Sequence, residues 1–222
     1  MRVIAGTARS IPLETPAGKE TRPTTDKIKE TLFNMLQFEV QGCVFGDLFA
    51  GSGAIGIEAL SRGAAGCVFC DRSEPAVRAV TANLRKCHLE KQAVVMKGEA
   101  RLAVPAVKRM LAEQTGSLAG AANGEQKRTG EQAVEQAPEQ TMEGNENRPK
   151  LIIFLDPPYD KGLELQVLEA VMGEDLLQEG DLVILETSLC SDLTPLTALG
   201  LEIFKEKNYK NQRHIFMRKA AI

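Results

Sequence analysis

Residues 46–60 read GDLFAGSGAIGIEAL, and Gly51, Gly53 and Gly56 within them form the pattern G-x-G-x-x-G. An apolar stretch precedes this pattern, and a helix-forming stretch follows it. Glycines at such a strand-to-helix junction allow the backbone to approach a ligand closely. Asp71 follows twenty residues after Gly51, where a carboxylate can hold the ribose of an adenosine-containing cofactor. The pattern predicts a nucleoside cofactor, and a dinucleotide is its most direct interpretation.

Expected strands and helices alternate from Cys43 to the end of the chain. The strands are expected at 43–49, 66–70, 93–96, 151–155 and 181–187, followed by closing strands at 201–207 and 213–218. The helices are expected at 54–62, 74–87, 100–112 and 163–172, with a short one from about 192. This alternation predicts an α/β, Rossmann-like fold with a parallel sheet and helices on both faces. Within the first of these helices, Gly56 is expected to allow close packing against the first strand.

The segments outside this alternating pattern are expected to form one domain with it, over residues 1–222. Residues 1–40 form an N-terminal extension, with a small hairpin and then a helix that starts in RPTTD, residues 22–26. Residues 113–149 are rich in Glu, Gln, Gly and Ala and nearly free of large apolar residues. Such a segment buries too little surface to offset its ordering entropy. We therefore expect a disordered insertion there.

Composition and charge indicate an ordinary globular protein. The sequence has neither an apolar run of membrane-spanning length nor a secretion signal, so we expect a cytoplasmic protein with no membrane partner. The net charge of −3 does not suggest general attraction to nucleic acid, although residues 205–219 hold six Lys and Arg and one Glu. Cys67 and Cys70 form a C-x-x-C dyad inside an apolar run, without a second pair of ligands. We interpret them as packed, reduced cysteines and expect no metal.

Asp47 bears on which cofactor lies on the glycine turn. A carboxylate near the end of a buried strand is costly without a partner. A pyrophosphate would be the wrong partner, because both groups are negative. S-adenosylmethionine carries an ammonium, a sulfonium and no phosphate, and fits far better. The alternative is that Asp47 caps backbone amides of its own turn. Asp71 supports either cofactor, and Glu99 and Ala100 lie where an adenine edge could be recognised.

The chemistry is indicated by LDPPYDKG, residues 155–162, directly after the apolar fourth strand. An exocyclic amine on a base is a poor nucleophile because its lone pair is delocalised into the ring. The Asp156 carboxylate and the Pro157 carbonyl can accept its two N–H groups and expose that lone pair, while Pro158 stiffens the turn. Tyr159 offers a ring on which an extruded base can stack. The alternative, a simple strand terminator, accounts only for the prolines.

These motifs together resemble the bacterial family that methylates guanine N2 in 16S rRNA, within the class I S-adenosylmethionine-dependent methyltransferases. The matching stretches are RVIAGTARS, RPTTDKIKETLFNML, DLFAGSGAIGIEALSRGA and IIFLDPPYDKG. The resemblance implies a seven-stranded sheet with the last strand antiparallel. It also implies S-adenosylmethionine as cofactor, and 16S rRNA as substrate within a 30S subunit or assembly intermediate, acted on by a monomer.

The resemblance further implies roles for individual residues. The methionine side of the cofactor would be lined by Asp47, Phe49, Gly51 and Gly53. Asp71 would hold the ribose, and Arg72, Glu99 and Ala100 would flank the adenine. Catalysis would fall to Asp156, Pro157, Pro158 and Tyr159. Thr24 would cover the cofactor, and Arg9 and Arg22 would face RNA. Two features depart from the family: the long 113–149 insertion, and NYKNQRHIF, which lacks a glycine that many relatives have after the tyrosine.

Three alternatives stay open. An adenine N6 methyltransferase acting on DNA or RNA would use the same D-P-P-Y turn. A nicotinamide-dependent oxidoreductase would explain the G-x-G-x-x-G pattern, but Asp47 argues against it. A non-catalytic RNA-binding module would not need Asp156.

Overall fold

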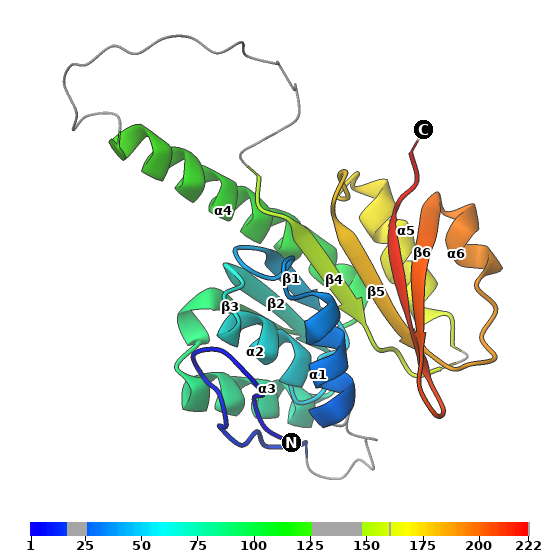
Figure 1. The fold of residues 1–222 in the computed structure, drawn as a ribbon, viewed down its shortest axis with the longest axis horizontal. Helices are drawn as coiled ribbons and strands as arrows, with labels where there is room; N and C mark the ends of the chain where they lie inside the picture. The colour runs from blue at the N-terminus through cyan, green and yellow to red at the C-terminus, as the bar shows by residue number, and fades with distance from the viewer. Residues whose placement is uncertain (17–25, 126–147, 160, 222) are drawn as a thin grey trace.

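A seven-stranded sheet forms the centre of the molecule (Figure 1). The computed structural model describes residues 1–16, 26–125, 148–159 and 161–221. The strands are β1 (Val44–Asp47), β2 (Gly66–Asp71), β3 (Ala93–Lys97), β4 (Leu151–Leu155), β5 (Leu182–Thr187), β6 (Leu201–Asn208) and β7 (Arg213–Lys219). They lie in the order β3-β2-β1-β4-β5-β7-β6. The first five are parallel, and β7 runs antiparallel to both of its neighbours. This confirms the predicted α/β, Rossmann-like sheet.

Helices cover both faces of the sheet. They are α1 (Asp26–Met35), α2 (Ala54–Ser61), α3 (Glu74–Cys87), α4 (Val104–Glu125), α5 (Leu163–Gly173) and α6 (Thr194–Ala198), with short 3-10 turns at Glu90–Gln92 and Ala100–Ala103. Side chains of α1, α2 and α3 share one hydrophobic core, and side chains of α4, α5 and α6 share the other. Strand β4 is buried throughout because it contributes to both: Ile152 and Phe154 enter the first core, and Leu151, Ile153 and Leu155 the second.

The structure corrects the expected helix over 100–112 and the start of the insertion. Residues 100–103 form a 3-10 turn, and α4 begins at Val104, where Pro105 fits the first helical turn. The helix continues to Glu125, so the prediction of an insertion without regular structure is wrong over 113–125. Alanine, leucine and glutamine in this stretch have a high intrinsic helix propensity. Residues 126–147 lie outside the described residues, and for them the expectation stays a prediction.

The N-terminal extension forms one antiparallel bridge, between Arg2 and Pro12, in place of a longer hairpin ladder. The residues next to this pair make its cross-strand hydrogen bonds: the Val3 amide donates to the Ile11 carbonyl and the Leu13 amide to the Met1 carbonyl, both at 3.0 Å. The extension is also anchored by side chains of the helices beneath it. Glu58 in α2 accepts hydrogen bonds from the amides of Ile4 (2.8 Å) and Ala5 (3.0 Å). The predicted start of the following helix lies partly outside the described residues, which resume at the first residue of α1.

A buried ion pair completes this anchor. Lys29 Nζ lies 3.1 Å from Glu58 Oε2, and neither side chain is exposed. The same ammonium donates a 2.6 Å hydrogen bond to the Arg2 carbonyl. Arg62 Nε lies 2.8 Å from the other Glu58 oxygen. The carboxylate is therefore surrounded by donors, which is what a buried charge requires.

Two further predictions are settled by packing. Cys67 and Cys70 are buried and free, and they enter opposite hydrophobic cores, so one site could not use both thiols. The reading of them as packed cysteines is confirmed. Gly56 packs against β2 rather than β1: a Cβ there would lie 2.3 Å from Phe69 Cε1 and 2.7 Å from Cys67 Sγ. No helix in the described parts of the chain combines the length and apolar character needed to cross a bilayer.

Candidate active site

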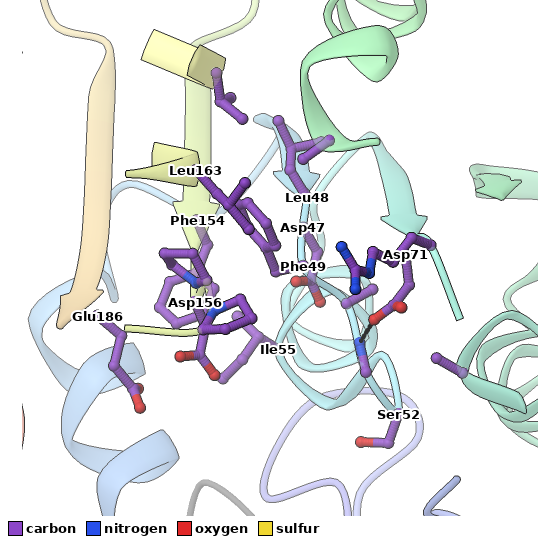
Figure 2. A pocket seen from close by; sticks show the side chains of 18 of the residues that line it. Asp47, Leu48, Phe49, Ser52, Ile55, Asp71, Phe154, Asp156, Leu163 and Glu186 are labelled. Atoms are coloured by element: carbon purple, nitrogen blue, oxygen red, sulfur yellow. Dashed lines mark hydrogen bonds between the residues drawn. The ribbon is translucent and has the colours of Figure 1, made fainter. Parts of the chain in front are cut away.

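A cavity of about 680 Å³ lies at the carboxyl ends of β1, β2, β4 and β5 (Figure 2). This is a usual size for a small-molecule site, and the carboxyl edge is where α/β sheets bind ligands. The structure brings together here both motifs singled out in the sequence, the glycine turn and the D-P-P-Y turn. The predicted residues that line it are Asp47, Phe49, Gly51, Asp71, Arg72, Glu99, Ala100, Asp156, Pro157, Pro158 and Tyr159.

The glycine turn is held by Asp71. Gly51 and Gly53 have φ angles of +55° and +75°, which favour glycine. The Gly51 amide donates a 2.9 Å hydrogen bond to one Asp71 oxygen, and the Ser73 amide a 2.8 Å bond to the other. A carboxylate has about four acceptor positions, so these bonds leave room for ribose hydroxyls. Asp71 thus fastens the turn to β2 as well as facing the cavity.

Asp47 is almost completely buried at the end of β1, with 2% of its surface exposed. Its Oδ2 accepts a 3.0 Å hydrogen bond from the Gly56 amide. The alternative reading of Asp47 as an amide cap is therefore confirmed for one oxygen, although the residue also lines the cavity. Burial raises the pKa of Asp47 to about 7, the nearby Asp71 charge adds to this effect, and the Gly56 bond opposes it. A cation in the cavity would favour the charged form.

Asp156 follows β4 at the opposite wall of the cavity. Burial raises the pKa of its carboxyl well above the ordinary range, and the charges of Glu186 and Asp47 act in the same direction. Tyr159, at the end of the same turn, is partly buried, and its hydroxyl lies 3.5 Å from Glu186 Oε1. The turn therefore brings the Asp156 carboxyl group, both prolines and the Tyr159 ring to one cavity.

Glu186 and Gln212 are cavity residues that the sequence analysis missed. Glu186 lies in β5 and is 4% exposed. Gln212 Nε2 donates a 2.5 Å hydrogen bond to Glu186 Oε1, and His214 Nε2 lies 2.8 Å from Glu186 Oε2. A signal for Glu186 did exist, since an acid that ends the apolar run DLVILET is the same kind of feature as Asp47. Finding Gln212 required knowing that β7 lies beside β5.

The remaining predicted residues fall into two groups. Gly53 is the left-handed residue before α2 and packs against Val80 and Ile57 rather than lining the cavity. Arg9 is exposed in the N-terminal turn, away from the cavity lining. Thr24 and Arg22 lie outside the described residues. The N-terminal arm nevertheless reaches the cavity, through Met1, Thr15 and Pro16.

The charges of the cavity distinguish between the two candidate cofactors. Its described lining carries five acidic side chains, at Asp47, Asp71, Glu99, Asp156 and Glu186, against the guanidinium groups of Arg72 and Arg101. Arg101 already pairs with Glu99, at 2.9 Å. A pyrophosphate at the glycine turn would face Asp47 and Asp71 together, whereas an ammonium would be attracted to them. The residues therefore fit S-adenosylmethionine better than a dinucleotide.

A Rossmann-like sheet with this glycine turn and a D-P-P-Y turn in one cavity defines a methyltransferase.

Comparison with known proteins places the chain more narrowly. The family model described as "Conserved hypothetical protein 95" matches residues 1–114 and 107–218. A Bacillus subtilis protein, provisionally named rRNA methyltransferase YlbH, is 36% identical over 94% of each chain. Ribosomal RNA small subunit methyltransferase D of Escherichia coli K12 is 30% identical over 93% of this chain and 84% of the relative. The chain belongs to this family of rRNA methyltransferases.

A solved structure supports the fold independently. The E. coli protein provisionally named methyltransferase yhhF superimposes with a TM-score of 0.68 and 23% identity, over 100% of this chain and 99% of the other. At this identity the likeness concerns the fold alone.

Proposed function

We propose that this protein is an S-adenosylmethionine-dependent methyltransferase that modifies the exocyclic N2 amine of a guanine in small-subunit rRNA. The observation that carries the proposal is the position of two acids in one cavity: Asp47 beside the glycine turn, and Asp156 at the start of the proline turn. The first suits a cationic cofactor, and the second suits an amine. The names of both relatives support an rRNA substrate, and the name of the Escherichia coli relative supports the small subunit.

In this proposal one part of the cavity wall binds the cofactor, and another part binds the base. Asp47, Phe49 and Gly51 face the amino-acid part of the cofactor, with Gly53 shaping the turn behind them. Asp71 binds the ribose, and the residues around the adenine are Arg72, Glu99 and Ala100. When bound, S-adenosylmethionine supplies a methyl group on a positively charged sulfur. The N-terminal arm closes one side of this space, and Thr24 is proposed to belong to the same cover.

The D-P-P-Y turn acts on the base. The Asp156 carboxylate accepts one N–H of the amine, and the Pro157 carbonyl accepts the other, so the nitrogen lone pair is directed at the methyl group. Tyr159 stacks on the base, and Pro158 keeps the turn rigid. The amine held in this way would take the methyl group that bound S-adenosylmethionine supplies, and the carbon–sulfur bonding pair would stay with sulfur. The positive charge that develops on nitrogen is stabilised by Asp156, and the amine then releases one proton to Asp156 and onward to water.

The RNA and the setting of the reaction belong to the same proposal. Arg9, Arg22 and the basic segment at residues 205–219 would face the RNA, while the substrate would be a 30S subunit or an assembly intermediate. The protein would act as a cytoplasmic monomer.

The test is mass-spectrometric mapping of small-subunit rRNA from cells that lack the gene. We expect one guanine N2 methyl group to disappear and to return with the wild-type gene. Asp156→Ala should fail to restore it, whereas the surface control Asp192→Ala should restore it. A missing adenine methyl group would instead support the N6 alternative.

A second measurement separates the cofactor from the chemistry. Purified Asp156→Ala should still be stabilised by S-adenosylhomocysteine, by about 2.7 kcal/mol at 100 times the dissociation constant. Stabilisation of the wild-type protein by NAD alone would contradict the proposed cofactor and favour the oxidoreductase. Normal methylation by Asp156→Ala would favour a different catalytic residue.

A further inference from the structure

Glu186 lies directly beside the catalytic turn. Leu155 of β4 pairs with Leu185 of β5, so Asp156 and Glu186 are the next residues on two neighbouring strands. Figure 2 shows both carboxylates directed to the same side of the cavity. The charge of Glu186 is one cause of the raised pKa of Asp156. Glu186 therefore lies close enough to act on the group that is proposed to hold the amine, and it lines the same cavity.

Hydrogen-bonding side chains surround the Glu186 carboxyl group. Its Oε2 contacts His214 Nε2 at 2.8 Å, and the other ring nitrogen of His214 lies 3.2 Å from the Tyr209 hydroxyl. If Tyr209 donates to Nδ1, then Nε2–H donates to Glu186, and a neutral His214 satisfies both contacts. Gln212 donates to Oε1 at 2.5 Å. The carboxylate is thus oriented by groups that donate to it.

The Glu186 carboxylate still has acceptor positions that a ligand could use. A carboxylate offers about four acceptor positions, and Gln212 and His214 use two of them. The Tyr159 hydroxyl, at 3.5 Å from Oε1, lies at the outer limit of a hydrogen bond. A base that stacks on Tyr159 would bring its own N–H groups to this side of Glu186. The acceptor therefore faces the position of the base, next to the acceptors that hold its amine.

The ring position beside the amine differs among the bases. In guanine, N2 neighbours N1–H, which is a donor. In adenine, N6 neighbours N1, and in cytosine, N4 neighbours N3, and both of these ring nitrogens are acceptors. A carboxylate beside the amine site attracts the donor of guanine and repels the lone pair of the other two bases. A site built to bond an N–H strongly rejects an analogue that lacks it.

We propose that Glu186 is a specificity-determining residue that selects guanine by accepting the N1–H next to the N2 amine held at Asp156. The inference rests on the proposed function and adds the group that distinguishes guanine from adenine, which the D-P-P-Y turn cannot do. Gln212 and His214 act through Glu186 as positioning residues.

The sharpest probe is 2-aminopurine in place of the target guanine. This base keeps the N2 amine but has an acceptor at N1. The mapped guanine is replaced in 16S rRNA joined from segments and reconstituted into 30S subunits, and methyl transfer from labelled S-adenosylmethionine is measured. Wild-type protein should favour guanine over 2-aminopurine in kcat/KM by about 10- to 100-fold. Equal use of both bases by the wild-type protein would overturn the proposal without any variant.

Glu186→Gln tests the residue itself. Glutamine has the same shape, and its amide can donate to N1 of 2-aminopurine as well as accept from guanine. The preference for guanine should fall by at least about tenfold. Glu113→Gln, on the exposed face of α4, should keep the wild-type preference. Stabilisation by S-adenosylhomocysteine should be equal in all three proteins, which shows that the fold and cofactor site are intact.

The outcomes separate this inference from the proposed function. An unchanged preference in folded Glu186→Gln, with guanine still methylated, would overturn the role of Glu186 alone. Absence of guanine methylation by the wild-type protein would overturn the proposed function and this inference with it.

Discussion

The Gly56 amide donates a 3.0 Å hydrogen bond to Asp47 Oδ2, and this bond joins the helix after the glycine turn to the acid at the end of β1. Without a side chain, Gly56 also allows α2 to lie against Phe69 and Cys67 of β2. The position of the buried acid therefore depends on the packing of the helix. The glycine pattern contributes to the electrostatics of the site as well as to its shape.

Asp47→Asn should relieve a stability cost that the buried acid imposes on the free protein. The pKa of Asp47 is raised from 3.8 to about 7, so the folded protein keeps a proton that the unfolded chain releases between these values. The unliganded wild-type protein should therefore lose stability as the pH rises from 5 to 8, by roughly 1–4 kcal/mol from this group. Urea unfolding at both pH values should show a smaller loss in Asp47→Asn.

The same acid should make cofactor affinity depend on pH. Because the charged form of Asp47 attracts the ammonium group, S-adenosylhomocysteine should bind wild-type protein more tightly at pH 8 than at pH 6. Calorimetric titration should find weak binding to Asp47→Asn, with little dependence on pH in this range. Equal affinities of the two proteins would show that Asp47 serves only as the cap for Gly56.

Gly56→Ala should destabilise the fold through overpacking. The added Cβ would meet the ring of Phe69 at 2.3 Å, and neither the ring nor the strand beneath it can move freely. We expect a loss of about 1–3 kcal/mol or more in the free energy of unfolding. Gly116→Ala is the control, because it lies in α4 with no atom within 4 Å of its added Cβ and should stabilise the helix by about 0.5–1 kcal/mol. Equal behaviour of the two variants would contradict the packing argument.

Glu58→Ala should have the largest effect on stability. It would leave the buried Lys29 ammonium without its partner and the amides of Ile4 and Ala5 without an acceptor. Loss of one partner of a buried pair costs about 3–5 kcal/mol. Lys29→Met should cost less, because Glu58 keeps Arg62 and both amides. Chemical unfolding measures the difference, and a smaller loss in Glu58→Ala than in Lys29→Met would refute this account.

The pH dependence of methyl transfer should reflect Asp156. Its carboxylate must be ionised to accept the amine, and its pKa is raised by burial, then by Glu186 of β5 and Asp47 of β1. The rate should therefore fall as the pH decreases through this raised pKa, well above the ordinary range of an aspartate. In Glu186→Gln one of the causes is removed, so the acidic limb should move to lower pH. A limb at the same pH in both proteins would contradict the coupling of these two acids.

Most of the sheet could be predicted because its strands carry local signals. Strand β4 is an uninterrupted apolar run followed by prolines, and α3 begins where Pro75 fits a first helical turn. The glycine turn and the D-P-P-Y turn were placed correctly since each directly follows such a strand. The extent of α4 was missed, because the sequence of residues 113–125 has no apolar stripe from which a helix could be predicted.

The rest of the site depends on contacts between distant parts of the chain. Glu186 lies beside Asp156 because β5 pairs with β4. Gln212 reaches Glu186 because β7 lies between β5 and β6. The pair of Lys29 with Glu58 connects the N-terminal extension to α2, although neither residue stands out in the sequence. Local patterns indicate which turns bind ligands, but the sheet order determines which further side chains meet there.

The direction of α4 indicates where a tag can be inserted into the protein. The helix starts on the cavity side of the sheet and leads away from it, and β4 begins at the edge opposite the cavity (Figure 1). At 1.5 Å per residue, its 22 residues span about 33 Å. A fluorescent reporter or an affinity handle grafted between Glu125 and Arg148 would join the protein on the side remote from the reaction, and should leave catalysis undisturbed.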